Sequence, residues 1–209
     1  MIRAVVSDFG GVLTSPLLEA FARMQDVTEI PPEAYGSAFM HALEHDGEHP
    51  LFALERGEVT EAEFLARMER GLAAVLGRPV SLHGFGTRFM DELHPNHELF
   101  GRYREWRSHG IRFALCTNNV REWEPLWRPK LPIDEVFEVV VDSGFVGTRK
   151  PEPEIYAITL ERLGLPGEAC AFVDDVELNV AAAREAGMHG IHFRDTAQAV
   201  AELGSLLTP

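Results

Sequence analysis

The chain has 209 residues, 45% of them hydrophobic and 25% charged, which is the balance of an ordinary folded domain. Its formal net charge of -14 repels nucleic acid and anionic membrane surfaces, so neither is expected as a partner. No stretch approaches the roughly 20 consecutive apolar residues of a membrane span, and the N-terminus reaches Asp8 too early for a secretory signal. These features predict a cytoplasmic protein and make no prediction of its oligomeric state.

The first predicted element is a short buried strand over residues 4–6, which leads directly into Asp8, Gly10 and Gly11. A single aspartate after a strand is usually a turn or helix-cap residue. The two glycines do not begin a dinucleotide-binding fingerprint, because the spacing of that motif is absent. The meaning of Asp8 therefore depends on what the other strands carry at their ends.

Residues 15–91 carry no convincing strand pattern and are predicted to be helical. Apolar residues recur there at helical spacing in three stretches. The stretches contain Leu17, Leu18, Phe21 and Met24; Tyr35, Phe39 and Leu43; and Phe64, Leu65, Met68 and Leu72. Thr60 and Glu63 form the capping-box pattern that begins the third helix. The segment is therefore predicted to be a helical insertion into a core made of residues 1–14 and 92–209.

The rest of the chain alternates strand-like apolar runs with helical stretches. The runs are residues 111–116, 136–141, 170–173 and 189–193. One helix is predicted to begin at Pro151 and stop at Gly164, and another spans about residues 177 to 186. The alternation predicts an α/β fold, a Rossmann-like, mostly parallel sheet with helices on both faces. Cys116 and Cys170 fall inside the runs and are expected to be buried, reduced thiols.

Polar residues follow four of the predicted strands at their carboxyl ends, where ligands bind in open parallel sheets. They are Asp8, Thr117 with Asn118, Lys150, and the adjacent pair Asp174 and Asp175. Adjacent carboxylates repel each other, and a nearby cation is the natural remedy. Lys150 precedes a helix start, where the helix dipole disfavours a cation. A role in an anion-binding site therefore explains this lysine better than a purely structural role does.

These groups together suit phosphoryl transfer, which requires positioning and charge stabilisation around an in-line displacement. Asp8 and the aspartate pair offer the hard oxygen ligands that Mg²⁺ prefers. The metal ion and Lys150 would supply the positive potential that a chain of net charge -14 otherwise lacks. The Thr117 hydroxyl and the Asn118 backbone N–H can hold phosphoryl oxygens. Asp8 can then attack phosphorus as a carboxylate and form an aspartyl-phosphate that water hydrolyses.

The four segments resemble the four motifs of the haloacid dehalogenase superfamily, in the usual order. The most specific are residues 149–156 and 172–180. Together with residues 8–13 they resemble the branch that holds sugar-1-phosphate phosphatases and the N-terminal phosphatase domain of soluble epoxide hydrolase. By this resemblance the helical insertion, residues 15–91, is a small cap domain.

The resemblance implies a Mg²⁺-dependent phosphatase that acts on a small phosphorylated metabolite, such as a sugar phosphate. It implies that Asp8 is the nucleophile, that Gly10 gives its carbonyl to Mg²⁺, and that Lys150 bridges nucleophile and phosphate. It further implies that Asp175 binds the metal directly and Asp174 through water. Thr117 and Asn118 would bind the phosphate.

Gly10 departs from the family pattern, because most phosphatases of the superfamily have there a second aspartate that serves as general acid and base. Such help is typically worth about 10²–10⁴-fold in rate. Three consequences stay open: slow turnover, a proton donor from the cap or a water, or a leaving group that needs little protonation. An anomeric phosphate fits the third, which predicts faster hydrolysis of sugar 1-phosphates than of 6-phosphates.

Two other functions also stay open. The dehalogenases of the superfamily lack the second aspartate too, so C–halogen hydrolysis is compatible with Gly10, although it leaves the aspartate pair unexplained. A catalytically weak phosphate-binding or regulatory protein is the other alternative.

Four histidines and two tryptophans are weaker candidates for a functional role. His41, His45, His49 and His83 lie in the insertion, but their spacing is a weak zinc motif. Trp123 and Trp127 are expected to be packing residues rather than a substrate platform.

Overall fold

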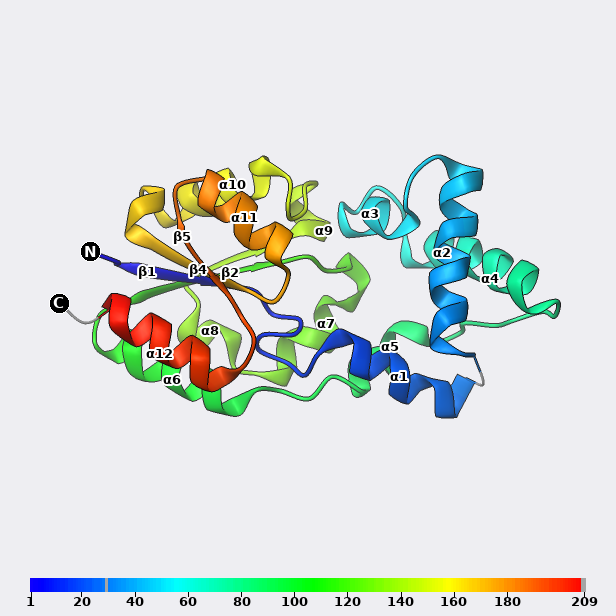
Figure 1. Ribbon diagram of the computed structural model, residues 1–209, viewed down its shortest axis with the longest axis horizontal. Helices are drawn as coiled ribbons and strands as arrows, with labels where there is room; N and C mark the ends of the chain where they lie inside the picture. Colours follow the sequence, from blue (N-terminus) through cyan, green and yellow to red (C-terminus); the bar gives the residue numbers. More distant parts are fainter. Residues whose placement is uncertain (29, 208–209) are drawn as a thin grey trace.

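The computed structural model describes residues 1–28 and 30–207 (Figure 1). Within these residues the core is a sheet of five parallel strands in the order β3-β2-β1-β4-β5. The strands are β1 (Ala4–Ser7), β2 (Arg112–Thr117), β3 (Val139–Asp142), β4 (Cys170–Asp174) and β5 (His189–His192). The predicted α/β fold with a parallel sheet is confirmed.

β1 lies at the centre of the sheet, because all four of its residues are buried and it pairs with a strand on each side. In this register Ser7 lies opposite Leu115 of β2 and Val173 of β4. Since the three strands are parallel, the residues that follow them emerge at the same edge. The sheet therefore brings together chain segments that are far apart in sequence.

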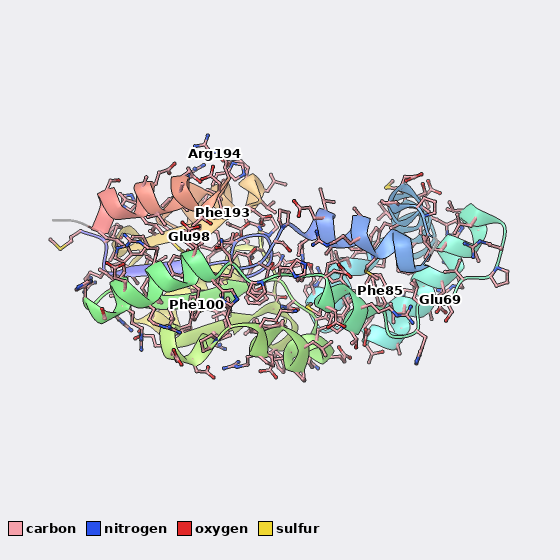
Figure 2. All side chains as sticks on the ribbon, turned by 90° about the horizontal axis from the view of Figure 1, so that it is seen from below. Glu69, Phe85, Glu98, Phe100, Phe193 and Arg194 are labelled. Carbon is pink, nitrogen blue, oxygen red and sulfur yellow. The ribbon has the colours of Figure 1, made fainter. Side chains whose placement is uncertain are left out.

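Helices cover both faces of the sheet. They are α10 (Pro153–Leu163) and α11 (Glu177–Glu185) on one face, and α6 (His97–Ser108) and α12 (Thr196–Leu207) on the other (Figures 1 and 2). Tyr156 of α10 packs against Phe172 of β4, with ring centroids 5.5 Å apart. Tyr103 of α6 packs against Phe113 of β2, with ring centroids 4.9 Å apart. Aromatic side chains thus anchor helices to both faces of the sheet.

Short helices complete the core. They are α7 (Glu124–Trp127), α8 (Ile133–Val136), α9 (Ser143–Val146) and the 3-10 turns η1 (Arg121–Trp123), η2 (Arg128–Lys130) and η3 (Gly167–Ala169). The strand predicted over residues 136–141 was too long, because the Phe137 N–H bonds back to the Ile133 carbonyl and closes α8. Pairing with β2 begins only when the Glu138 N–H donates to the Phe113 carbonyl, at 3.0 Å.

The predicted helix start at Pro151 is wrong by two residues, since α10 begins at Pro153. Glu152 is the N-cap residue, and its carboxylate Oε2 accepts hydrogen bonds from the Arg149 N–H at 3.0 Å and the Thr148 hydroxyl at 2.8 Å. This turn holds the chain out of the helix. The helix predicted over residues 177–186 is confirmed as α11.

The insertion is helical throughout its described part and lies beyond the carboxyl ends of the strands (Figure 1). Its helices are α1 (Leu17–Thr28), α2 (Pro32–Asp46), α3 (Pro50–Glu55), α4 (Glu61–Leu76) and α5 (Phe85–Asp91). The predicted capping box is present, since the Glu63 N–H bonds to the Thr60 hydroxyl and the Thr60 N–H to the Glu63 carboxylate. Leu18 departs from the predicted stripe, because 82% of it is exposed.

Two chain crossings join the insertion to the core. Thr14 and Pro95 form an antiparallel bridge, and the Ser15 N–H donates to the His94 carbonyl at 2.8 Å. The division into a core of residues 1–14 and 92–209 and a cap of residues 15–91 stays a prediction, and these contacts lie close to both of its boundaries.

Cys116 and Cys170 are buried thiols, as predicted. Among the described residues, no helix combines the length and apolar character required to cross a membrane.

Candidate active site

A buried ion-pair cluster lies at the carboxyl edge of the sheet. The Lys150 ammonium is 2.7 Å from Asp8 Oδ1, just after β1, and 2.6 Å from Asp174 Oδ2, the last residue of β4. Only 1% of the Lys150 side chain and none of the Asp174 side chain is exposed. The structure therefore brings these three residues together, as the sequence predicts.

Asp175 completes a group of three carboxylates. Asp8, Asp174 and Asp175 each offer an oxygen, and these oxygens lie within 4.8 Å of one another. Burial raises the pKa of Asp8 to about 7, and the charges of Asp174 and Asp175 add to the rise while Lys150 opposes it. Burial lowers the pKa of Lys150, but the Asp174 and Asp8 carboxylates outweigh it and hold that pKa well above its usual range. The cluster thus has more negative charge than Lys150 alone balances, and its hard oxygen donors could hold a divalent cation.

The Asp174 carboxylate is held in place by three groups. Its Oδ1 accepts hydrogen bonds from the Val176 N–H at 2.9 Å and the Asn179 side-chain amide at 3.0 Å, while Oδ2 faces Lys150. Asn179 is itself fixed, since the Tyr156 hydroxyl donates to its carbonyl at 2.9 Å. Asn179 was not among the predicted site residues, although it stands five residues after Asp174 within the motif of residues 172–180.

Gly11 leaves room for Asp175. A Cβ at position 11 would lie 2.2 Å from Asp175 Oδ2, and the glycine has a φ of +81°, a conformation that other residues rarely adopt. The backbone of this loop therefore approaches the carboxylate more closely than any residue with a side chain would allow.

Asn118 positions Lys150 through a two-point contact. Its side-chain amide donates to the Lys150 carbonyl at 2.9 Å, and its side-chain oxygen accepts from the Lys150 N–H at 2.7 Å. The sequence predicts a role only for the backbone N–H of Asn118, in phosphate binding, and gives no sign of this side-chain contact. Thr117, at the end of β2, is 99% buried beside the cluster.

The insertion lies close to Gly10, the position where most phosphatases of the superfamily have an acid–base residue. A Cβ at Gly10 would lie 3.2 Å from Leu17 Cδ2, in α1. A side chain at position 10 would therefore require Leu17 to shift by a few tenths of an ångström. The glycine is visible in the sequence, but the position of Leu17 against it is not.

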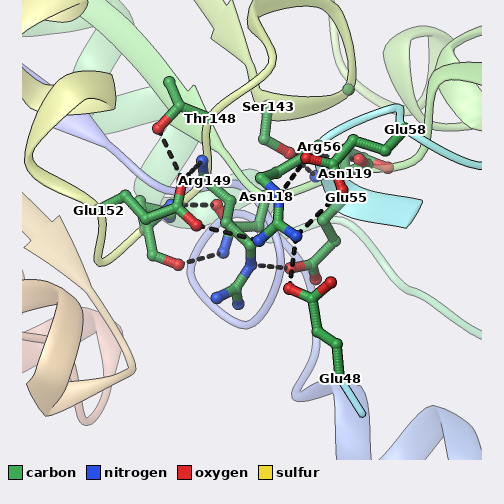
Figure 3. Close-up of polar contacts among 12 residues, drawn as sticks. Glu48, Glu55, Arg56, Glu58, Asn118, Asn119, Ser143, Thr148, Arg149 and Glu152 are labelled. Atoms are coloured by element: carbon green, nitrogen blue, oxygen red, sulfur yellow. Dashed lines mark hydrogen bonds and ion pairs between the residues drawn. The ribbon is translucent and has the colours of Figure 1, made fainter. Parts of the chain in front are cut away.

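Ion pairs link the insertion to the core next to this cluster (Figure 3). Glu55, at the end of α3, lies 2.5 Å from Arg149 Nε, and the side chains of both are 13% exposed. Burial raises the pKa of Glu55, and Arg149 opposes that shift. Arg56 reaches across to Glu152 at 3.2 Å. The insertion is thus held to the loop that carries Lys150.

Among the histidines and tryptophans considered as weaker candidates, two are packing residues and one lines a cavity next to the site. His49 stacks between Phe39 and Phe52, with centroids 4.7 and 4.8 Å away. Trp127 is fully buried against Phe9, as predicted for a packing residue. Trp123 is different, because it lines a cavity that reaches Thr117 and Asn118.

The model of the haloacid dehalogenase-like hydrolase family matches residues 2–187. The chain therefore belongs to the haloacid dehalogenase-like hydrolases, and the resemblance inferred from its motifs is confirmed.

This chain spans well under two thirds of the length of the relatives that it matches. Acyl-CoA dehydrogenase family member 10 of Mus musculus is 28% identical over 98% of this chain, which spans 19% of that protein. Bifunctional epoxide hydrolase 2 of Rattus norvegicus is 25% identical over 97% of this chain, which spans 38% of that protein. The phosphorylated carbohydrates phosphatase of Thermotoga maritima is 33% identical over 48% of each chain.

Solved structures share the fold. A HAD-like family hydrolase of Porphyromonas gingivalis superposes with a TM-score of 0.71, 24% identity and coverage of 97% of this chain and 98% of that one. A HAD family enzyme of Bacteroides thetaiotaomicron, solved with magnesium and inorganic phosphate, superposes with a TM-score of 0.62 and 22% identity. The match covers 90% of this chain and 92% of that one. An L-2-haloacid dehalogenase superposes with a TM-score of 0.66 and 21% identity, and the match covers 90% of this chain and 84% of that one.

Proposed function

We propose that the chain is a Mg²⁺-dependent phosphatase that hydrolyses a small phosphorylated metabolite through an aspartyl-phosphate on Asp8. The observation that carries the proposal is the buried cluster in which Lys150 bridges Asp8 and Asp174 while Asp175 stands beside them. A relative named as a phosphatase and a structural neighbour solved with magnesium and phosphate support the same assignment.

The cluster fits Mg²⁺ by its donors and its charge. Three carboxylates with oxygens within 4.8 Å of one another, and the carbonyl of Gly10 two residues after Asp8, are the kind of oxygen ligands that this ion prefers. Both oxygens of Asp174 are already bonded to protein groups, which favours Asp175 as direct ligand and Asp174 as a ligand through water. When bound, the ion would offset the repulsion between these carboxylates and a substrate phosphate.

The residues of this chain then divide the chemistry. An oxygen of Asp8 attacks phosphorus, the ester P–O bond breaks, and the leaving oxygen takes a proton from water. Lys150 and the Thr117 hydroxyl hold phosphoryl oxygens, with the Asn118 N–H as a further donor. Water next attacks phosphorus, the bond from Asp8 to phosphorus breaks, and phosphate and the free carboxylate are released.

Acetyl phosphate tests this proposal directly, because it has almost no organic body and a good leaving group. We expect Mg²⁺-dependent hydrolysis by the wild type and a loss of at least about 10³-fold in Asp8→Asn, as for removal of other nucleophiles. Asp142→Asn is the matched control: Asp142 is also a buried aspartate at a strand end, but its Oδ1 caps Gly144 instead of joining the cluster. Wild-type activity in Asp8→Asn would falsify the assigned nucleophile.

C–halogen hydrolysis is the second candidate, favoured by Gly10 with Leu17 against it and by the structural likeness to a haloacid dehalogenase. The three carboxylates count against it, because halide displacement on carbon needs no divalent cation. Release of halide from 2-haloacids that persists in EDTA would favour this candidate over the phosphatase.

A phosphate-binding protein without turnover is a third candidate, which the absence of a carboxylate at Gly10 favours. Binding of a phosphate analogue such as vanadate, together with no hydrolysis of acetyl phosphate, would favour it.

A further inference from the structure

A cavity of about 170 Å³ lies between the insertion and the core. Its wall on the insertion side comes from all five helices, α1 to α5, with aromatic rings such as Phe21, Phe64, Phe85 and Phe89. These rings contact one another, for example Phe21 and Phe89 with centroids 4.7 Å apart. Figure 2 shows Phe85 on the insertion side of the molecule. The wall is therefore built largely from apolar side chains that hold each other in place.

The cavity is continuous with the proposed phosphate site. Gly10, Thr117 and Asn118 form its wall on the core side. A phosphate held by Thr117 and Asn118 therefore projects its ester group into this apolar space. The absence of a side chain at Gly10 and the presence of Leu17 make the junction apolar as well.

Three polar side chains in the wall already bond to other protein groups. Both amide positions of Asn118 bond to Lys150, Asn119 Oδ1 accepts from the Val120 N–H at 2.9 Å, and Glu55 is paired with Arg149. A sugar placed here would have to bury several hydroxyls with few partners, and each unpaired hydroxyl would weaken binding. An apolar group has no such cost and is favoured by the burial of its own surface.

The size of the cavity sets the size of its occupant. An engineered apolar cavity of about 150 Å³ in another protein binds benzene, and this one is of similar volume. We propose that the substrate is a phosphate monoester of an apolar alcohol whose organic part is about the size of a benzene ring. This inference rests on the proposed function and replaces the sugar phosphate expected from the family resemblance.

Benzyl phosphate and glucose 6-phosphate distinguish an apolar substrate from a sugar phosphate. Both esters release a primary alcohol on hydrolysis, and they differ in the polarity of the organic part. We expect kcat/KM for benzyl phosphate to exceed that for glucose 6-phosphate by at least about 10-fold, the usual discrimination of a hydrophobic pocket. Glucose 1-phosphate is expected to be poor as well. Equal or faster hydrolysis of either sugar phosphate, with acetyl phosphate hydrolysed normally, would overturn the inference and leave the proposed function intact.

A pair of variants on α4 locates the effect. Leu65→Gln places an amide in the cavity wall, whereas Val75→Gln makes the same kind of change at a residue that is 42% exposed and outside the wall. We expect Leu65→Gln to lower the ratio of benzyl phosphate to acetyl phosphate turnover by about 10-fold, and Val75→Gln to leave it unchanged. An unchanged ratio in Leu65→Gln, with a normal melting temperature, would contradict the assignment. Failure of wild type to hydrolyse acetyl phosphate would overturn the proposed function and the inference with it.

Discussion

The carboxyl edge of the sheet and the wall of the insertion face each other across one cavity, yet they are built by opposite means. At the sheet edge, Asp8, Lys150 and Asp174 are buried charges that hydrogen bonds and ion pairs fix in place. In the insertion, aromatic rings are fixed by packing, with Phe21 and Phe89 in contact. The contrast separates two tasks. The charged edge is suited to act on a phosphoryl group, and the apolar wall is suited to choose what that group is attached to.

Substitutions in the two regions should also have different effects. A buried charge that loses its partner is costly, because the remaining charge stays out of water. A packed apolar wall that receives one polar group changes selectivity more than stability when, as at Leu65, the side chain is only partly buried. The following predictions probe this contrast, beginning with the largest expected effect.

Removal of the central cation should have the largest effect. Lys150→Met keeps the length of the side chain but leaves Asp8 and Asp174 unpaired, so we expect the free energy of unfolding to fall by about 3–5 kcal/mol. Urea unfolding at pH 7 in EDTA measures it. Arg184→Ala is the control, because its pair with Glu177 is about half exposed at 2.7 Å and should cost less than about 1 kcal/mol. Equal losses in the two variants would contradict the view that the core cluster is the more sensitive.

The stability of the metal-free protein should depend on pH. The pKa of Asp8 is raised from 3.8 to about 7, so its protonated form stabilises the fold at low pH, and that stability is lost as pH rises through 7. We expect a decrease on the order of 3 kcal/mol between pH 4 and pH 8 in EDTA. The charges of Asp174 and Asp175 repel the ionised Asp8 carboxylate, and a bound cation would offset this repulsion. Mg²⁺ should therefore raise the melting temperature more at pH 8 than at pH 5. Asp8→Asn should show a smaller slope, and an equal slope would refute this explanation.

The boundary between the two regions can be changed from apolar to acidic. Gly10→Asp combined with Leu17→Ala supplies a carboxylate and clears the side chain that would meet it. We expect kcat for benzyl phosphate to rise by about 10²-fold, the lower end of what general acid–base catalysis provides. Leu17→Ala alone enlarges the cavity without adding an acid and should give no such rise. If the double variant were no faster than Leu17→Ala, the space beside Gly10 would not be the place of the missing proton donor.

The sheet edge could be predicted from sequence more fully than the insertion could. Parallel strands place their carboxyl ends at one edge, so Asp8, Thr117 and Asp174 were expected together from the order of the elements alone. Lys150 was grouped with them by the same reasoning, although α9 and a loop separate it from the end of β3. The contact between its backbone and the Asn118 side chain depends on the exact path of a loop, which residue patterns do not define.

The insertion was predictable as helices but not as a wall. Helical spacing correctly placed Phe64, Met68 and Leu72 on a buried face of α4. The same spacing cannot show which helices pack together or what space they leave, because that depends on contacts between residues far apart in sequence. For this reason the position of Leu17 against Gly10 emerged only from the structure.

Arg149 and Lys150 are consecutive residues with contacts in opposite directions. The first pairs with Glu55 of the insertion, and its guanidinium carbon lies 4.1 Å from the centre of the Phe52 ring. The second pairs with the carboxylates of the core. One peptide unit therefore separates the side chain that binds the insertion from the side chain that binds the core cluster. A chimera that carries another insertion would have to retain an acidic partner for Arg149 to keep this link, which Figure 3 shows as the contact between Glu55 and Arg149.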